Sequence, residues 1–429
     1  MKKTIVALAA FLQAFSCYAQ TEFERFFTDE CLRVDYELVG DSKSVSFVLK
    51  EMKMQGVWAG NRNVGDTCQM GCYRFSVIDS VSGKMLYQNG FSSLFDEWRQ
   101  SPEARRCTQS FYHVSLMPFP RQTVKFRFEQ MNRDRAGYSV MTEFYINPKN
   151  KFIRCESANI FKNSVIHGGG DVCNKVDVAF LAEGYTAAQM DKFRNDVKRV
   201  WQYMSGVGPF KTYSDMFNIY AVESPSAECG TDIPNKGLYR NTVLNTTYST
   251  FDIDRYLTTF DTKAIHDVAA CVPYDHVIIL VNTDEYGGGG FYNFYSAGTI
   301  DNNLSLRVIV HEFGHGFAGL GDEYFYADEA NENMYSLARE PWEPNLTTMV
   351  DFDSKWKSML NQATPVPTPR TKKYESVVGV FEGGGYMAKG MYSPAQDCIM
   401  RSNNPSEFCP VCLKAIERAI LSHKTRKVE

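Results

Sequence analysis

The hydrophobic pattern of this chain changes its period after the first third of its length. In residues 20–150, hydrophobic and polar residues alternate, which is the period-two pattern of half-buried strands. The clearest examples are residues 32–38, 45–49 and 124–128. Turn-forming residues such as Gly40 and Asp41 separate these segments. We therefore expect residues 20–160 to form a β-sandwich-like N-terminal domain.

Continuous apolar runs replace this alternation after the segment 160–172, which we interpret as a linker because it contains three consecutive glycines. Strands are predicted at residues 176–181, 217–222 and 276–281, and the last is a continuous apolar run typical of a strand covered on both faces. Residues 187–204 carry an apolar stripe at helical spacing, and Thr186 is a suitable N-cap for that helix. The order strand, helix, strand predicts a mixed α/β domain over residues 165–429. The fold class expected for the whole chain is therefore α+β or mixed.

The first residues have the features of a signal peptide. Two lysines precede a short apolar run at residues 5–15, and cleavage before Gln20 would release residues 1–19. This run is shorter than the roughly 20 residues that span a membrane, and no other stretch is apolar enough to be a transmembrane helix. We expect an exported protein that is secreted, periplasmic or attached to the cell surface. A lipoprotein acylated at Cys17 is the less favoured alternative, because the preceding residues match a lipobox poorly.

The composition is that of a globular protein without a nucleic-acid partner. Hydrophobic residues make up 44% of the chain and charged residues 22%, which are ordinary values for a folded domain. The 46 basic residues are outnumbered by 50 acidic ones, giving a net charge of −4. Nucleic-acid binders usually carry a basic excess, so we expect no such partner.

Eleven cysteines remain after cleavage, because Cys17 accounts for one of the twelve in the full chain. An exported protein can form disulfides, so we expect structural disulfides whose pairing the sequence does not reveal. The segment Cys409-Pro410-Val411-Cys412 is also compatible with a redox-active pair or with half of a zinc site. No second such pair accompanies it, which disfavours these two alternatives.

The sequence HEFGH at residues 311–315 lies in an apolar run that predicts a buried helix. Positions i and i+4 share one face of a helix, so His311 and His315 can bind one zinc ion at about 2 Å. Glu312 follows the first histidine, where its carboxylate can take a proton from a water molecule. The alternative is a core helix whose histidines only make hydrogen bonds. The long apolar lead-in, the glycine-rich exit and two following acidic residues count against that alternative.

A third zinc ligand is expected shortly after this helix. Gly319 would end the helix by adopting a left-handed conformation. The chain then turns back, and Asp322 or Glu323 can supply the third ligand that a catalytic zinc ion requires.

Further along the chain, residues 398–400 read Cys-Ile-Met. After a helix, a glycine and an acidic ligand, this segment resembles the Met-turn of metzincins, in which a methionine packs beneath the metal without binding it. The resemblance implies this role for Met400. The alternative is a buried methionine in an ordinary turn.

Three segments, HEFGHGFAGLGDEY, FLAEGYTAAQMDKF and VNTDEYGGGGFYNFYSAG, resemble the IgA-cleaving zinc metallopeptidase family of bacteria. The similarity covers about residues 165–421, and residues 20–150 resemble the β-rich N-terminal domain of that family. The resemblance implies a metzincin-like catalytic domain with His311 and His315 as zinc ligands and Glu312 as catalytic residue. Counted from the second histidine, Gly319 and Asp322 each lie one position later than the glycine and the third ligand of metzincins. The separation between the glycine and the acidic residue is therefore the same. The spacing therefore favours Asp322 as third ligand, with Glu323 as the alternative.

Four glycines precede the zinc-binding motif. In metzincin-like domains an edge strand upstream of the zinc helix binds the substrate backbone as an added strand. Gly288, Gly289 and Gly290 are therefore candidate substrate-binding residues that would let a peptide approach closely. The alternative is a flexible loop. The oxyanion that forms during hydrolysis needs a donor, and the candidate hydroxyls belong to Tyr324, Tyr386 and Tyr392.

The function expected from these features is hydrolysis of peptide bonds in extracytoplasmic proteins by a Zn²⁺-dependent endopeptidase. The expected partner is a protein or peptide substrate, with host immunoglobulin A among the candidates. The alternative is a non-enzymatic surface protein that binds glycan or protein and keeps a structural zinc ion. Glu312 disfavours that alternative, because a structural site needs no base. A zinc hydrolase of non-peptide amide bonds is the third possibility.

Overall fold

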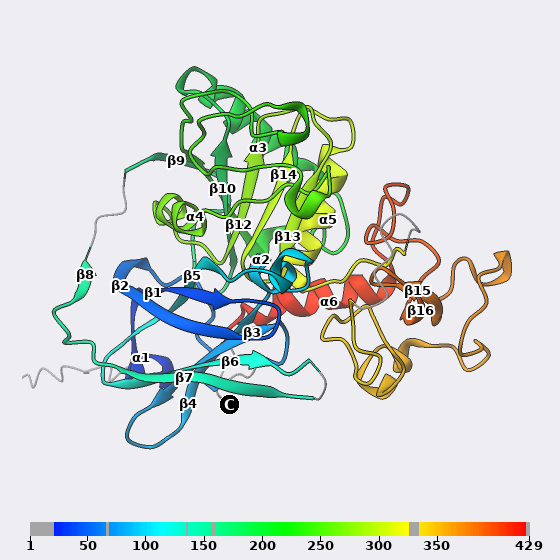
Figure 1. Ribbon diagram of the computed structural model, residues 1–429, viewed down its shortest axis with the longest axis horizontal. Helices are drawn as coiled ribbons and strands as arrows, with labels where there is room; N and C mark the ends of the chain where they lie inside the picture. The colour runs from blue at the N-terminus through cyan, green and yellow to red at the C-terminus, as the bar shows by residue number, and fades with distance from the viewer. Residues whose placement is uncertain (1–20, 66–67, 134–135, 156–159, 326–333, 426–429) are drawn as a thin grey trace, which may run out of the picture.

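A computed structural model describes residues 21–65, 68–133, 136–155, 160–325 and 334–425. The chain forms a β-rich N-terminal part and a larger α/β part that lie against each other (Figure 1). The expected signal peptide, with Cys17, lies outside the described residues. None of the helices in the described ranges combines the length and apolar character needed to cross a membrane.

Two four-stranded sheets make up the described N-terminal part. The first has the strand order β5-β1-β2-β8 and the second β4-β3-β6-β7. The strands are β1 (Phe27–Gly40), β2 (Val45–Val57), β3 (Tyr73–Asp79), β4 (Met85–Phe91), β5 (Gln109–Pro120), β6 (Val124–Met131), β7 (Tyr138–Ile146) and β8 (Ile153–Cys155). Two short helices, α1 (Glu22–Phe26) and α2 (Leu94–Trp98), accompany them.

Aromatic side chains join the two sheets face to face. Tyr36 of β1 lies 5.2 Å from Phe128 of β6, measured between ring centroids, and Phe47 of β2 lies 5.0 Å from the same ring. The alternating residues of β1 and β6 point into this core, where Tyr36 and Phe128 are fully buried. The β-rich N-terminal domain predicted from the period-two pattern is therefore confirmed.

A six-stranded sheet with the order β13-β14-β12-β10-β11-β9 forms the centre of the α/β part. Its strands are β9 (Lys162–His167), β10 (Val176–Glu183), β11 (Phe217–Glu223), β12 (His276–Val281), β13 (Gly288–Phe291) and β14 (Tyr295–Thr299). The four inner strands are parallel, and the two edge strands β13 and β9 are antiparallel to their neighbours. The linker interpretation of residues 160–172 is wrong for residues 162–167, because β9 pairs with β11 and completes the sheet.

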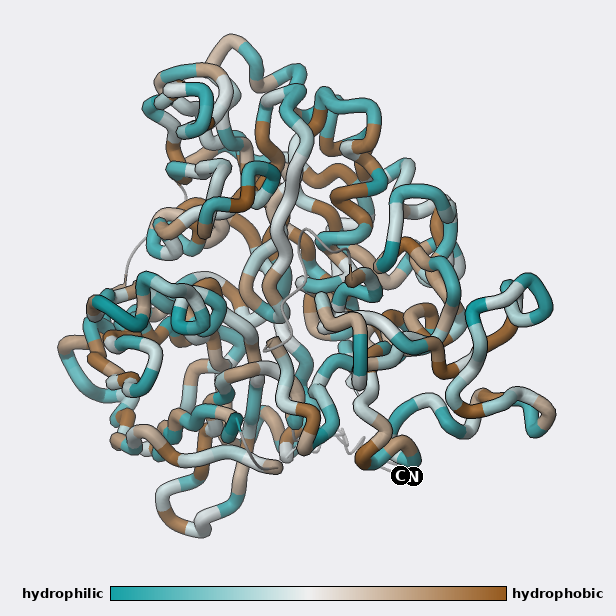
Figure 2. The backbone as a smooth tube through the Cα atoms, turned by 45° about the vertical axis from the view of Figure 1, so that its right-hand side comes forward, coloured by the Kyte–Doolittle hydropathy of each residue, from teal (hydrophilic) through white to brown (hydrophobic). Residues whose placement is uncertain are grey.

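Four helices of the described residues accompany this sheet, and the sequence predicted two of them, the helix near residues 187–204 and the one that carries HEFGH. The four helices are α3 (Met190–Met204), α4 (Thr262–Ala269), α5 (Ser305–Ala318) and α6 (Pro410–Ser422). The predicted start at residue 187 is a 3-10 turn, Ala187–Gln189, that leads into α3. The apolar faces of α3, α5 and α6 share one hydrophobic core with the sheet. Hydrophobic backbone segments accordingly run through the interior, and hydrophilic segments mark the outer loops (Figure 2).

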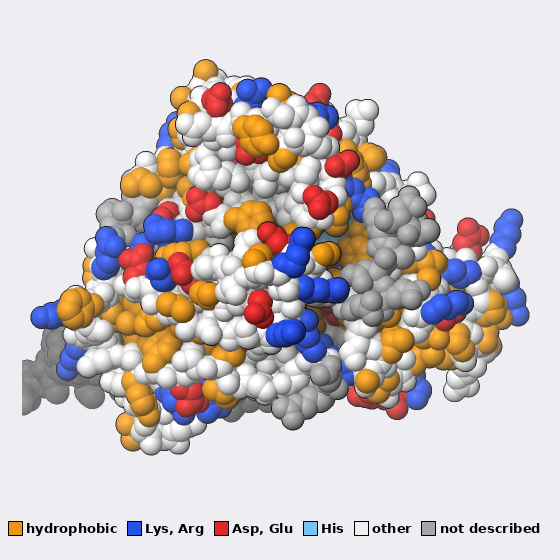
Figure 3. Space-filling model, in the orientation of Figure 1, with side chains coloured by type: hydrophobic (Ala, Val, Ile, Leu, Met, Phe, Trp, Pro, Cys, Tyr) orange, Lys and Arg blue, Asp and Glu red, His pale blue; other side chains and the backbone are white. Residues whose placement is uncertain are grey.

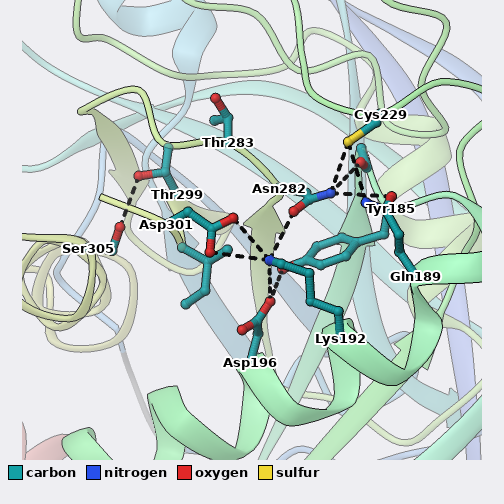
Figure 4. Close-up of polar contacts among 12 residues, drawn as sticks. Tyr185, Gln189, Lys192, Asp196, Cys229, Asn282, Thr283, Thr299, Asp301 and Ser305 are labelled. Carbon is teal, nitrogen blue, oxygen red and sulfur yellow. Dashed lines mark hydrogen bonds and ion pairs between the residues drawn. The ribbon is translucent and has the colours of Figure 1, made fainter. Parts of the chain in front are cut away.

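A polar network at the carboxyl ends of the parallel strands fixes the approach to α5 (Figure 4). The Lys192 ammonium of α3 lies 2.7 Å from Asp196, 3.0 Å from Asn282 at the end of β12 and 3.0 Å from Asp301. Asp301 lies in the loop that enters α5 four residues later. This network therefore links α3, the sheet and the loop that positions α5.

Hydrogen bonds and an ion pair join the N-terminal part to the α/β part. The backbone N–H of Ser92 donates to the carbonyl of Tyr292 (2.9 Å), and Arg33 forms a 2.7 Å ion pair with Asp267 of α4. A small hairpin, β15 (Phe381–Gly384) with β16 (Met387–Ser393), precedes α6. On the face shown in Figure 3, acidic and basic side chains are interspersed over both parts.

Candidate metal centre

Helix α5 carries both histidines of the HEFGH sequence, and its end is set by a glycine. Gly319 has a φ of +62°, the left-handed conformation expected for it. Its N–H donates to the carbonyl of His315 (3.0 Å), and the next N–H donates to the carbonyl of Gly314 (3.2 Å). The first of these bonds, with the left-handed glycine that donates it, forms an αL C-cap motif, which ends the helix and turns the chain back. The following residues 320–323 consequently return toward the helix face that carries the histidines.

Three ligand atoms converge at this face. The Nε2 atoms of His311 and His315 are 3.0 Å apart, and Asp322 Oδ1 lies 3.1 Å from the first and 3.3 Å from the second. A tetrahedral metal that binds each atom at about 2.0–2.1 Å would separate its ligands by about 3.3 Å. The spacing of the three atoms therefore matches a single zinc-sized ion.

Backbone carbonyls fix the tautomers of both imidazoles. His311 Nδ1 donates to the carbonyl of Ile399 (2.9 Å), and His315 Nδ1 donates to the carbonyl of Leu320. Each Nε2 therefore presents a lone pair, as a metal-binding imidazole does. Two lone pairs and one carboxylate oxygen directed at a common point repel one another unless a positive charge lies between them.

Asp322 is held with one oxygen toward the imidazoles. The Tyr386 hydroxyl donates to Oδ2, while the buried Oδ1 accepts no hydrogen bond within the described part of the chain. Burial alone would raise the pKa of Asp322, but the two imidazoles outweigh this effect and hold the pKa well below its usual range. Likewise, burial lowers the pKa of His315, but Asp322 outweighs it and raises this pKa to about 9. Both shifts have the same cause, the attraction between the Asp322 carboxylate and the imidazoles.

Glu312 lies on the side of α5 that faces strand β13. One of its carboxylate oxygens lies within 4.8 Å of a ligand nitrogen of each histidine. Burial raises the pKa of Glu312, and the adjacent imidazoles oppose that effect. The carboxylate is therefore close enough to the two histidine nitrogens to contact a small molecule held beside them.

The close packing of α5 against β13 leaves no room for a side chain at Gly288 or Gly290. A Cβ atom at Gly288 would lie 2.6 Å from Glu312 Oε1, and one at Gly290 would lie 2.4 Å from the Glu312 carbonyl oxygen. Gly288 also uses its N–H and C=O to bond Arg255 and Leu257, so this part of the sheet edge is already paired. Gly289 faces the same segment, with the Leu257 carbonyl 2.7 Å from the position of its Cβ. Close packing of α5 therefore explains these glycines, while peptide binding by Gly288, Gly289 and Gly290 stays a prediction.

The Gly290→Ala variant is expected to lose about 1–3 kcal/mol of stability, because its methyl group would overlap the backbone of α5. Gly170→Ala is the matched control, since its Cβ would meet no atom within 4 Å. Denaturant unfolding of both variants measures the difference. Equal stability would show that α5 can move away from β13 at little cost.

Met400 packs against α5 at Gly314. It is fully buried, and its sulfur lies 2.9 Å from the Cβ position of Gly314, the residue before His315. Residues 398–401 form a turn in which the N–H of Arg401 donates to the Cys398 carbonyl (2.8 Å). The same turn supplies the Ile399 carbonyl that orients His311. The Met-turn role of Met400 stays a prediction.

Replacing Met400 by alanine is expected to lower the free energy of unfolding by about 2–5 kcal/mol, the range for truncating a buried methionine. The cavity would lie against α5 at Gly314, the residue before His315, so metal retention should fall as well. Thermal unfolding and a chelator titration measure the two effects. Met52→Ala, which changes a half-buried methionine of β2, should cost less, and an equal cost would contradict a special role for Met400.

Glu323 points away from the histidines. It is fully buried, and its Oε1 lies 3.2 Å from the sulfur of Cys412. Cys398, Cys409 and Cys412 surround it. All eleven cysteines of the described residues are free, so the expectation of structural disulfides is wrong for them.

Sequence reasoning missed two residues next to the centre. Asn345 exchanges two hydrogen bonds with the backbone of Gly321 (2.7 and 2.8 Å) and donates to Glu323 (3.0 Å), which fixes the loop that carries Asp322. Glu97 of α2 reaches the centre from the N-terminal part, where it accepts a 2.5 Å hydrogen bond from Tyr256. Burial raises the pKa of Glu97 to about 7. Neither residue lies near the motif in sequence, so only the folded chain reveals them.

The three tyrosines considered as oxyanion donors are in different places. The hydroxyls of Tyr324 and Tyr386 are 3.3 Å apart, and the second contacts Asp322. Tyr392 lies on β16, where its backbone pairs with Thr347. The first two hydroxyls are therefore the ones near the metal ligands.

The chain matches two family models. Residues 165–376 and 370–420 match the family described as IgA Peptidase M64, and residues 22–142 match the one described as Peptidase M64 N-terminus. A comparison with curated proteins found no match. The match to the first family model covers the whole region of the candidate metal centre, including α5 and the turn at Met400.

Proposed function

The chain belongs to the IgA peptidase M64 family, and from this premise we propose that it is a zinc-dependent endopeptidase with a metzincin-like catalytic domain. Membership establishes a peptidase that acts on protein or peptide substrates. The dependence on zinc, the endopeptidase mode and the metzincin-like arrangement are the proposal. The observation that carries it is the convergence of His311 Nε2, His315 Nε2 and Asp322 Oδ1 within 3.0–3.3 Å of one another.

The residues at this centre fit a zinc ion. Two imidazoles and one carboxylate form a three-ligand set of the kind that catalytic zinc uses, which leaves one position for water or substrate. Asp322 Oδ1 is buried without a hydrogen bond in the described chain, so a cation would satisfy it. The carbonyls of Ile399 and Leu320 keep both imidazoles in the tautomer that binds a metal through Nε2.

In the proposed reaction Glu312 is the proton carrier. When bound, the zinc ion polarises the scissile carbonyl and makes a water molecule a better nucleophile. The Glu312 carboxylate takes a proton from the attacking water and then gives it to the leaving amine nitrogen. Tyr386 keeps Asp322 oriented through its hydrogen bond to Oδ2.

The competing function, a binding protein with a structural zinc ion at this centre, is less consistent with the geometry. A structural site is closed by four protein ligands. Here the Glu312 carboxylate stands beside the ligand nitrogens of His311 and His315, in a position suited to a base. A hydrolase of non-peptide amide bonds would use the same residues, and substrate assays separate it from a peptidase.

Cleavage-site profiling tests the proposal. Purified protein would be incubated with a proteome-derived peptide and protein library, beside a Glu312→Gln control. New internal peptide termini that depend on Glu312, disappear with chelator and return with zinc are the expected result. A zinc-loaded protein that produces no such termini would reject the peptidase mechanism at this centre.

We also propose that the substrates are extracytoplasmic proteins reached after export by the signal peptide at residues 1–19. Immunoglobulin A is one candidate substrate. Incubating it with active enzyme and with the Glu312→Gln variant, followed by mass spectrometry, tests this directly. Intact heavy chains after prolonged incubation would remove immunoglobulin A from the candidates.

A further inference from the structure

Four side chains of metal-binding types form a second cluster close to the centre of His311, His315 and Asp322. One ligand atom from each of Glu323, Cys398, Cys409 and Cys412 lies within 4.8 Å of all the others. The Cys412 sulfur is 3.2 Å and the Cys409 sulfur 4.0 Å from Glu323 Oε1. These residues come from three segments: the loop after α5, the turn at Met400 and the start of α6.

The cluster is buried in the hydrophobic core shared by α3, α5 and α6. Glu323, Cys398 and Cys412 are fully buried, and Cys409 is 6% exposed. Asn345 donates to Glu323 Oε1, but Oε2 has no hydrogen-bond partner among the residues that the structure describes. A buried carboxylate oxygen without a partner is costly, and binding to a cation removes that cost.

The start of α6 favours a thiolate at Cys409, its N-cap residue. Cys409 is the N-cap residue of this 13-residue helix, and Cys412 lies in its first turn. The positive end of a helix stabilises negative charge, which includes the thiolate form of cysteine. In addition, the N–H of Cys409 donates to the Cys398 sulfur (3.2 Å). Thiolate, rather than thiol, is the form that binds a metal.

We propose that Glu323, Cys398, Cys409 and Cys412 bind a second zinc ion in a closed, structural site. Thiolate-rich four-ligand sets select zinc among the common divalent ions, and four protein ligands leave no position for substrate. A tetrahedral zinc ion separates its sulfur ligands by about 3.8 Å, so the cluster needs only small adjustments around an ion. A disulfide between two of the cysteines would use neither the third thiol nor the carboxylate.

The second ion would stabilise the backbone segments that carry Asp322 and the Ile399 carbonyl. Glu323 directly follows Asp322, and Cys398 directly precedes Ile399, whose carbonyl orients His311. The N–H of Glu323 also donates to the carbonyl of Met400 (2.8 Å), so the two segments already contact each other. An ion bound to both segments and to α6 would fix the backbone on which the first centre is built.

Metal analysis of a protein without the first centre tests this proposal independently of catalysis. The double variant His311→Ala, His315→Ala, purified with zinc and without chelator, is expected to retain about one zinc ion per chain. X-ray absorption at the zinc edge should then show sulfur neighbours at about 2.3 Å. Cobalt exchanged into this variant should give a sulfur-to-cobalt charge-transfer band.

Adding Cys412→Ser to the double variant should remove this zinc, whereas Cys155→Ser, which changes an exposed cysteine of β8, should leave it in place. Should the multiple variants fail to fold, the wild-type protein still decides the question. It should contain two zinc ions per chain with sulfur in the averaged coordination sphere. A single zinc ion with only nitrogen and oxygen neighbours, or a disulfide joining two of these cysteines in the native protein, would overturn the proposal.

Discussion

The Glu312→Gln variant is expected to lose about 10²–10⁴-fold in kcat, the range attributed to general acid–base catalysis. Glutamine has nearly the same size as glutamate, but its amide cannot take a proton from water. The metal ligands are separate groups on the same helix and the following loop, so zinc content should stay unchanged. Hydrolysis of a quenched fluorescent protein substrate, measured beside zinc content, tests both statements.

Glu30→Gln is a suitable control, because Glu30 is an exposed residue of β1 in the N-terminal part. It should retain wild-type activity. Wild-type turnover in the purified Glu312→Gln protein would exclude Glu312 as the base. A loss of zinc together with activity would instead indicate that Glu312 helps to bind the metal.

The Asp322→Ala variant is expected to weaken zinc binding at the histidine centre by more than about 100-fold. Outer-sphere partners of metal ligands typically contribute 10–100-fold to affinity, and a direct ligand should contribute more. The variant would also release the Tyr386 hydroxyl from its acceptor. Activity measured during a chelator titration reports this centre selectively, because only its metal takes part in the proposed reaction.

Asp215→Ala removes an exposed aspartate and serves as the matched control, for which no shift in the titration is expected. If Asp322→Ala tolerates chelator as well as this control does, the third ligand is another residue. The peptidase proposal would survive that result with a different ligand set.

The folded chain connects the N-terminal part to the candidate metal centre. Glu97 of α2 bonds Tyr256, and the backbone at Tyr256 pairs with Gly288 of β13. Gly288 in turn lies against Glu312. Removing residues 20–160 would therefore remove the contact of Glu97 with Tyr256, which supports β13 beside Glu312.

Much of the histidine centre could be predicted from the sequence, because it depends on local backbone geometry. The i, i+4 spacing places His311 and His315 on one helix face wherever that helix lies, because a helix repeats every 3.6 residues. Gly319 could be placed at the helix end for a similar reason, since its left-handed conformation is costly for other residues. Alternating and continuous apolar patterns likewise distinguished the β-rich part from the α/β part, because burial on one face or on two leaves different periods.

Contacts between distant segments decided what the sequence left open. Asp322 and Glu323 are adjacent, and neighbouring residues of a non-helical loop can point in opposite directions. Asn345 and the carbonyl of Met400 fix that loop, so Asp322 faces the histidines and Glu323 faces the cysteines. The cysteines at 398, 409 and 412 meet Glu323 only because α6 packs beside the turn at Met400. Such meetings depend on long-range packing, and no local pattern in the chain encodes them.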